Sequence, residues 1–269
     1  MQTADRRRFM SFVCEARWRG PSPEWRWPRT DSSGTVWGQD GAEEMAHSLA
    51  EDAAQVRASV AGLARDYGLR VFKAERWTAE EAGRLYEAAE ELSSLMGGSG
   101  RFRRELRRVP IWRTQRRTGM AAMAAPFVGV VYFKGASWGD APELKWQTVH
   151  ELAHVWDICS FYRLSRGLKR ATGSNYGRFR WQSPIPFEYE PGGQWLKGRR
   201  PPRNALEDWA DSVATYVYPS HAESCRPIPR LISPARWDYV REQMQVHLPY
   251  PSEWIAQFYG PDGVAPTPE

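Results

Sequence analysis

Cysteine is scarce in this chain, and its scarcity excludes two common kinds of protein. The 269 residues include three cysteines, Cys14, Cys159 and Cys225. An odd, widely spaced set with no C-x-x-C pair builds neither a disulfide framework nor a cysteine-ligated metal site. We therefore expect reduced thiols without a chemical role.

Long apolar runs are also missing. The longest weakly polar segment, Met120 to Phe133, includes Pro126 and Gly129 and falls short of the roughly 20 apolar residues that a membrane-spanning helix needs. The N-terminus is basic but has neither the apolar core nor the small-residue cleavage site of a secretory signal. The sequence predicts no membrane contact, and a cytoplasmic location is the default expectation.

Lysine is the third scarce residue, although the chain is basic. Its 37 basic and 32 acidic residues give a net charge of +5, and arginine supplies nearly all of the positive charge. Arginines cluster at Arg6 to Arg8, Arg101 to Arg108 and Arg199 to Arg203. Such clusters can attract phosphates or acidic peptides, but most are solvated faces, so nucleic acid is not the expected partner.

The composition and the spacing of apolar residues predict a globular protein with several helices. Hydrophobic residues make up 42% of the chain, and 14 residues are tryptophan, which predicts a sizeable core. Apolar spacing predicts a helix from Ala42 to about Tyr67, and a capping box of Thr78 and Glu81 starts a second helix that ends at Gly97. The other expected elements are strands at Phe102 to Arg113 and Phe127 to Phe133, a helix from Asp140 to about Phe161, an irregular Gly- and Pro-rich connection from Arg163 to Arg203, a helix opened by Asn204 and closed by Pro219, and a last helix from Ser233 to Met244.

One short motif carries chemistry. The segment VHELAHVWD contains H-E-L-A-H from His150 to His154. Residues four apart are separated by about 40° around a helix, so both imidazoles point the same way and can share one tetrahedral zinc. Glu151 lies beside them, where it can act as the general base on a zinc-activated water. A capping box of Asp140 and Glu143 supports the helix and makes a chance occurrence of the motif the weaker explanation.

A catalytic zinc needs a third protein ligand and an open position. A pattern with a third histidine after the motif would place glycine at position 157 and histidine at position 160, but this chain has Asp157 and Ser160 there. Glu207 and Asp211 lie on one edge of the helix opened by Asn204. The carboxylate of Glu207 would complete a His-His-Glu set, and Asp211 would accept a hydrogen bond from the far nitrogen of a ligating histidine. Alternatively, Glu207 is the acid of a capping box that follows Asn204.

These residues resemble a known group of zinc peptidases. HELAH, followed 53 residues after His154 by a helix with Glu-x-x-x-Asp, resembles the glutamate zincins (gluzincins), the thermolysin-like group. More narrowly, EDWADSVATYVY and a later Arg-Trp-Asp-Tyr-Val helix resemble the catalytic domain of anthrax lethal factor and its metallopeptidase relatives. The resemblance covers about residues 120 to 250.

The resemblance implies a fold and an activity. The fold would be α+β, with a zincin-like catalytic domain at residues 99–269 that contains an active-site helix, an edge strand and a glutamate helix. A helical N-terminal region at 41–98 and an irregular Arg/Trp/Pro-rich arm at 1–40 would precede it. The activity would be zinc-dependent hydrolysis of peptide bonds in a peptide or protein substrate. That substrate would lie along the strand from Phe127 to Phe133 as the edge strand.

Two supporting roles are less sharply defined. In the lethal-factor group a tyrosine shortly before the ligand glutamate stabilises the oxyanion, but arginines occupy that place here. Tyr189 is the candidate helper in its stead, with Tyr176 or a neighbouring arginine as alternatives. Asp157, one turn after His154, is either an acceptor behind a ligating histidine or one half of a surface salt bridge.

Two other functions stay open at this point. A protein that keeps the zinc fold for binding or structure would hold the metal without turning over a substrate. An arginine-rich nucleic-acid-binding protein would contain the H-E-x-x-H motif by accident. Metal content and the effect of Glu151→Gln on cleavage distinguish these functions from a peptidase.

Overall fold

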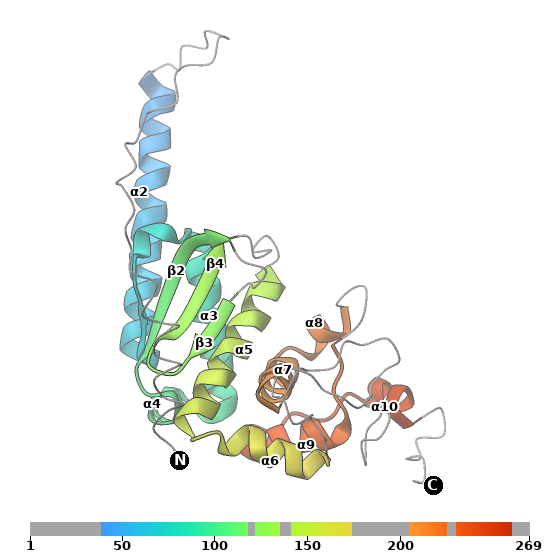
Figure 1. Cartoon of the computed structure of the whole chain (residues 1–269). Helices are drawn as coiled ribbons and strands as arrows, with labels where there is room; N and C mark the ends of the chain where they lie inside the picture. Colours follow the sequence, from blue (N-terminus) through green and yellow to red (C-terminus); the bar gives the residue numbers. More distant parts are fainter. Residues whose placement is uncertain (1–38, 118–121, 135–140, 174–204, 225–229, 260–269) are drawn as a thin grey trace. The chain divides into compact units, whose positions relative to one another are not determined.

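The computed structural model describes residues 39–117, 122–134, 141–173, 205–224 and 230–259 (Figure 1). It divides the chain into two compact units, Met1–Glu44 and Met45–Glu269. The predicted arm at 1–40 lies outside the described residues except at its end. The architecture that follows is that of the second unit.

Helices predominate in a mixed α and β structure with one four-stranded sheet. In chain order the elements are α2 (Gln39–Gly62), the π-helical turn η1 (Leu63–Tyr67), β1 (Leu69–Val71), the 3-10 turn η2 (Ala74–Arg76), α3 (Ala79–Met96), α4 (Ser99–Leu106), β2 (Val109–Arg117), β3 (Ala122–Ala125), β4 (Gly129–Lys134), α5 (Ala141–Cys159), α6 (Arg163–Thr172), α7 (Ala205–Val217), α8 (Pro219–Ser224), α9 (Pro234–Gln243) and α10 (Ser252–Tyr259). Within these ranges no helix has the length and apolar character needed to span a membrane.

The sheet has the strand order β1-β2-β4-β3. Strands β1, β2 and β4 are parallel, whereas β3 is antiparallel to β4, with Ala124 opposite Val130. Strand β4 confirms the strand predicted at Phe127 to Phe133, but its predicted place at the edge is wrong, because β4 lies between β2 and β3. The edge strands are β1 and β3, and β3 is the one next to β4. Its alanines and methionine carry no β-forming signal, so the sequence does not predict it.

Helix α5 occupies the centre of the fold. It packs against β3, β4 and α3, and α7 packs against it as well (Figure 1). The hydroxyl of Tyr132 on β4 lies 3.2 Å from that of Thr148 on α5, within hydrogen-bonding distance. One hydrophobic core continues from Val56 in α2 to Trp254 in α10. The helices predicted as a separate region at 41–98 therefore share their core with the elements that follow.

The two N-terminal helices confirm the predictions made for them. Helix α2 with η1 covers the stretch predicted from Ala42 to Tyr67. At the start of α3, the N–H of Glu81 donates to the Thr78 hydroxyl over 3.1 Å, and the N–H of Thr78 donates to the Glu81 carboxylate over 2.9 Å. Gly97 ends this helix with a φ of 98°, a left-handed conformation that favours glycine.

Three predictions of local structure are wrong. The strand predicted at Phe102 to Arg113 begins only at β2, because Phe102 and Leu106 are buried one turn apart on α4. The irregular connection predicted from Arg163 to Arg203 starts with helix α6, whose buried leucines are likewise four residues apart; the part from 174 onward lies outside the described residues. Helix α9, predicted as the last, is followed by α10.

Candidate metal centre

Helix α5 presents both histidines of the motif on one face. The Nε2 atoms of His150 and His154 lie 3.1 Å apart, and the rings meet edge-on with centroids separated by 4.7 Å. His150 is 9% exposed and its neighbours in the helix, Val149 and Leu152, belong to the core. Two imidazole nitrogens this close to one another are able to donate to a common cation.

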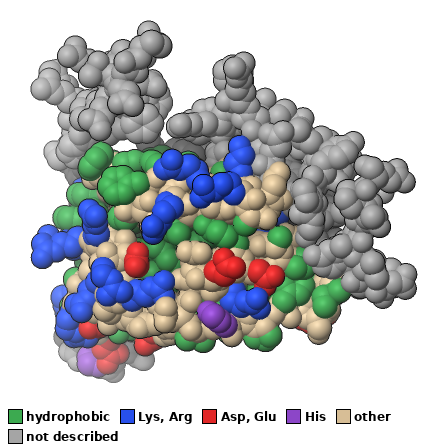
Figure 2. Space-filling model, turned by 90° about the horizontal axis from the view of Figure 1, so that it is seen from below, with side chains coloured by type: hydrophobic (Ala, Val, Ile, Leu, Met, Phe, Trp, Pro, Cys, Tyr) green, Lys and Arg blue, Asp and Glu red, His purple; other side chains and the backbone are tan. Residues whose placement is uncertain are grey.

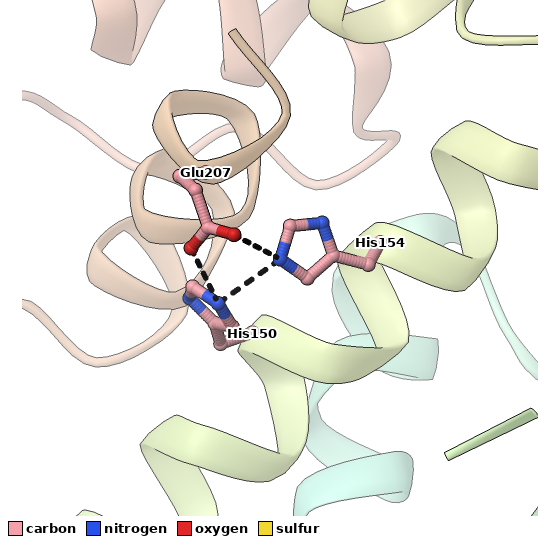
Figure 3. A group of neighbouring side chains, drawn as sticks. All are labelled: His150, His154 and Glu207. Carbon is pink, nitrogen blue, oxygen red and sulfur yellow. Dashed lines mark hydrogen bonds and ion pairs between the residues drawn. The ribbon is translucent and has the colours of Figure 1, made fainter. Parts of the chain in front are cut away.

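Helix α7 brings the carboxylate of Glu207 to the same place. Its oxygens lie 3.6 Å from Nε2 of His150 and 3.7 Å from Nε2 of His154 (Figure 3). One donor atom from each of these three side chains lies within 4.8 Å of the other two. The Glu207 side chain is 41% exposed, so the group of three is open to solvent on this side. Glu207 therefore turns toward the histidines.

A tryptophan and two alanines hold α7 against α5. The indole N–H of Trp209 donates to the carbonyl oxygen of Ala153 over 3.0 Å, and its ring meets Trp156 edge-on at 5.5 Å. Ala210 and Ala214 are fully buried, as expected where two helix backbones approach closely. Because Ala153 precedes His154 directly, this contact sets the position of α7 relative to the histidines.

A buried ion pair fixes the first turn of α7. The guanidinium of Arg236 on α9 donates to both carboxylate oxygens of Asp208, over 2.7 and 2.9 Å, and both side chains are inaccessible to solvent. Its third nitrogen donates to the hydroxyl of Ser233 over 3.2 Å, so that serine does not cap α9 through its side chain. Bidentate arginine–carboxylate pairs are geometrically specific. Since Asp208 follows Glu207, the pair holds the turn that presents Glu207.

Asp211 lies behind His150. Its Oδ1 is 2.9 Å from Nδ1 of His150, an ion-pair distance, although the N–H direction is off the line of a regular hydrogen bond. A carboxylate at Nδ1 favours the tautomer that leaves Nε2 free to bind a cation. This is the place that the sequence predicts for Asp211.

Glu151 is buried beside the histidines. It is 3% exposed, and its Oε2 has no hydrogen-bond partner among the described residues. Burial raises the pKa of this carboxyl to about 7, against the opposing effects of the His150 charge and of a hydrogen bond from the backbone of Ala124 on β3. A carboxyl group with a pKa near neutrality can accept and release a proton at physiological pH.

The two histidines differ in their affinity for a proton. Burial lowers the pKa of His150, but the neighbouring carboxylates of Asp211 and Glu207 outweigh that effect and raise the pKa well above its ordinary value. Burial and the charge of His150 lower the pKa of His154 to about 4. In the absence of a metal, a proton bound by this pair therefore resides on His150 rather than on His154.

The donor set fits a zinc ion. Zinc accepts imidazole nitrogen and carboxylate oxygen, and catalytic zinc sites use three protein ligands with one open position. His150, His154 and Glu207 supply two nitrogens and a carboxylate, and the exposed side of Glu207 leaves room for a further ligand. The carboxylates of Glu207 and Asp211 also provide the negative charge that a divalent cation requires.

Of the two residues with predicted supporting roles, one contacts α6 and the other lies outside the described residues. Asp157 is 1% exposed, and its Oδ1 accepts the backbone N–H groups of Leu164 and Ser165, each over 3.0 Å. It therefore caps the start of α6, and among the described residues its carboxylate makes neither the contact with a ligating histidine nor the surface salt bridge predicted for it. Tyr189, the predicted oxyanion helper, lies outside the described residues.

Sequence reasoning missed a second set of contacts next to the histidines. Glu143 is predicted as the acid of a capping box with Asp140, which lies outside the described residues. Its carboxylate accepts two hydrogen bonds from Arg230, over 2.8 and 2.9 Å, and lies 2.9 Å from His221. The Arg230 guanidinium also lies 4.2 Å from the ring centroid of Trp146, which packs against His150 at 5.4 Å. Trp146 precedes His150 by one helical turn. That spacing is the signal in the sequence that could have placed Trp146 beside the histidines.

Comparisons with protein-family models, with curated proteins and with solved structures found no match to this chain.

Proposed function

We propose that the protein is a zinc-dependent metallopeptidase. The observation that carries the proposal is the convergence of His150, His154 and Glu207 from two helices onto a common point, with donor atoms within 4.8 Å of one another. The buried carboxyl of Glu151 beside them supports a hydrolytic role rather than a purely structural one. Structural zinc sites in proteins are usually closed by four protein ligands, whereas the described residues contribute three to this group.

The proposed ligands are His150, His154 and Glu207, with Asp211 as the residue that orients His150. When bound by these groups, zinc would polarise the scissile carbonyl and lower the pKa of a water molecule. Glu151 would accept the proton of the attacking water and deliver it to the leaving amine. Its burial and raised pKa suit both steps, because a group that titrates near neutrality is able to take up and give back a proton.

The edge strand β3 is the proposed binding place for the substrate backbone. It is paired with β4 on one side, and the backbone of Ala124 is directed at Glu151. A peptide that adds to β3 as an extended strand would place its carbonyl groups next to α5. In this proposal β3, α5 and α7 are the edge strand, active-site helix and glutamate helix of a zincin-like domain.

Metal analysis and cleavage of an unstructured protein substrate test the proposal. We expect purified wild-type protein to hold about one zinc per chain, His150→Ala to lose it, and Glu151→Gln to keep it while cleavage is abolished. The matched control is Glu91→Gln on α3, which removes the carboxylate that accepts a hydrogen bond from Lys145 and should leave both properties unchanged.

Two outcomes would contradict the proposal. Cleavage that survives Glu151→Gln would exclude this residue as the base. A stoichiometric zinc content without cleavage of any member of a broad peptide library would point to a binding or structural role instead.

A further inference from the structure

A basic hollow lies at the C-terminal end of α5. It has a volume of about 630 Å³, and Cys159 and Phe161 form part of its wall. Figure 2 shows blue side chains gathered on the face that carries it. Five arginines and one glutamate, Glu105, supply its charged lining. The arginines are Arg104, Arg107, Arg163, Arg166 and Arg170.

Two segments distant in the sequence build this cluster. Arg104 and Arg107 belong to the end of α4 and the residue after it, and the other three lie on α6, where spacings of three and four residues place them on one face. The opposite face of α6 is buried, with Leu164 and Leu168 in the core. The fold therefore concentrates on one surface a charge that the sequence distributes over more than sixty residues.

Most of these arginines have no hydrogen-bond or ion-pair partner among the described residues. The side chains of Arg104, Arg107, Arg163 and Arg170 are exposed, and in the described ranges their guanidinium groups form no ion pair or hydrogen bond. Arg166 differs, because its guanidinium donates to the carbonyl oxygens of the two residues before α6. Arginines without partners keep their donors available for an external anion.

The stability of the helices does not explain the cluster. Cations near a helix C-terminus interact favourably with its dipole, which accounts for Arg104 and Arg170. Arg163 and Arg166 lie in the first turn of α6, where a cation faces the positive end of the dipole. Five guanidinium groups around one hollow also repel one another. An anionic ligand would offset both effects.

The corner between α5 and α6 presents an aromatic ring at the rim of the hollow. Phe161 is 76% exposed and has a φ of 55°, and Tyr162 beside it has a φ of 58°. Bulky residues rarely adopt this left-handed conformation. The buried carboxylate of Asp157 holds the corner by accepting two N–H groups of α6, and the N–H of Tyr162 donates to the Asp157 carbonyl over 2.8 Å. The backbone that carries the exposed ring is thus held in place by the fold.

We infer that this hollow binds single-stranded nucleic acid. Arginine forks match the geometry of phosphate oxygens, and a row of them along α6 can follow a phosphodiester backbone. The ring of Phe161 offers a stacking surface for an unpaired base, which neither a duplex nor an acidic peptide would use. This inference does not depend on the metal centre, which lies on another part of α5.

Fluorescence anisotropy with the full chain tests the inference. The probe is a labelled oligothymidine of about 15 nucleotides, titrated over a series of salt concentrations. The double variant Arg163→Gln/Arg170→Gln removes two exposed charges, and the matched control Arg57→Gln/Arg70→Gln removes two exposed charges from α2 and β1. Phe161→Asn removes the ring and substitutes a residue that tolerates the left-handed backbone.

We expect the α6 double variant to bind at least tenfold more weakly and to lower the slope of log K against log salt by about 1.4 in magnitude, or 0.7 per lost phosphate contact. Phe161→Asn should weaken binding about tenfold without changing that slope. The control double variant should bind like wild type.

Three results would overturn the inference. Equal losses in the two double variants would show attraction to net charge alone. Equal affinity for a duplex of the same length, with no effect of Phe161→Asn, would exclude base stacking. Binding of poly-glutamate but not of oligothymidine would identify the hollow as a site for acidic proteins.

Discussion

The candidate metal centre and the basic hollow both gather charges of one sign, but they differ in how those charges are held. At the centre, the carboxyl groups of Glu151, Glu207 and Asp211 surround two imidazoles on helices packed into the core. In the hollow, five guanidinium groups face one carboxylate at the surface. The first arrangement favours a cation as its ligand, and the second favours an anion.

The side chains of the two regions differ in how firmly neighbouring residues hold them, and this difference indicates different kinds of ligand. Two groups at the centre have a supporting contact: the Asp208–Arg236 pair lies beside Glu207, and Asp211 lies behind His150. Fixed donors suit one small ion with a defined coordination geometry. Arginines on exposed helix faces can adjust to a flexible chain that binds in several registers. The fold thus fixes the groups that would bind an ion and leaves free those that would bind a polymer.

Breaking the support of the metal centre should have the largest effect. Asp208→Ala leaves the buried charge of Arg236 without its carboxylate, and we expect the free energy of unfolding to fall by about 3–5 kcal/mol. Urea denaturation followed by tryptophan fluorescence measures this loss. The zinc content of the variant should fall as well, because Asp208 holds the turn that carries Glu207.

A matched aspartate on α9 serves as the control. Asp238, 52% exposed, pairs with Arg241 over 2.8 Å at the surface, and Asp238→Ala should cost less than about 1 kcal/mol. The double change Asp208→Leu/Arg236→Met should recover most of the stability, since an apolar pair of similar volume avoids the buried charge. Similar losses from Asp208→Ala and Asp238→Ala would contradict this account.

Removing one supporting contact while the ligands stay in place should have an intermediate effect. Asp211→Asn keeps the size of the side chain but removes the charge behind His150, and we expect zinc affinity to fall about ten- to a hundredfold, or about 1.4–2.7 kcal/mol. Competition with a chromogenic chelator measures the affinity. Asp52→Asn on the exposed face of α2 is the control. An affinity for zinc within twofold of wild type would show that Asp211 does not orient His150.

The parts of the site that follow from local spacing could be predicted from the sequence. Residues four apart on one helix share a face whatever the rest of the fold does, so the sequence alone indicates that His150 lies on one face with His154, and Glu207 with Asp211. The capping box at Thr78 is local in the same way and is present in the structure. Short-range geometry needs no knowledge of which elements pack together.

The parts that depend on packing could not be predicted. Asp208 and Arg236 are 28 residues apart, and nothing in either segment marks them as partners. Glu143 fits a capping box by spacing, yet tertiary contact with Arg230 determines where its carboxylate lies. The edge strand β3 is short and alanine-rich, and only its pairing with β4 makes it a strand. The residues that support the site were therefore less visible than the proposed ligands.

We expect the smallest effect on stability from replacing single arginines of the hollow in the absence of a ligand. Arg163 begins α6 and Arg170 lies in its last turn, so the same change from arginine to glutamine should act in opposite directions. Arg163→Gln removes a cation from the positive end of the helix dipole and should raise the free energy of unfolding by about 0.3–1 kcal/mol at low salt, whereas Arg170→Gln should lower it by a similar amount. Urea denaturation at two salt concentrations checks both signs, and high salt should reduce both differences.

With saturating oligothymidine the advantage of Arg163→Gln should disappear, because wild type then gains the phosphate contact that the variant lacks. A destabilising effect of Arg163→Gln without ligand would mean that this arginine stabilises the fold. The position of Arg163 at the start of α6 would then no longer support an anionic ligand in the hollow.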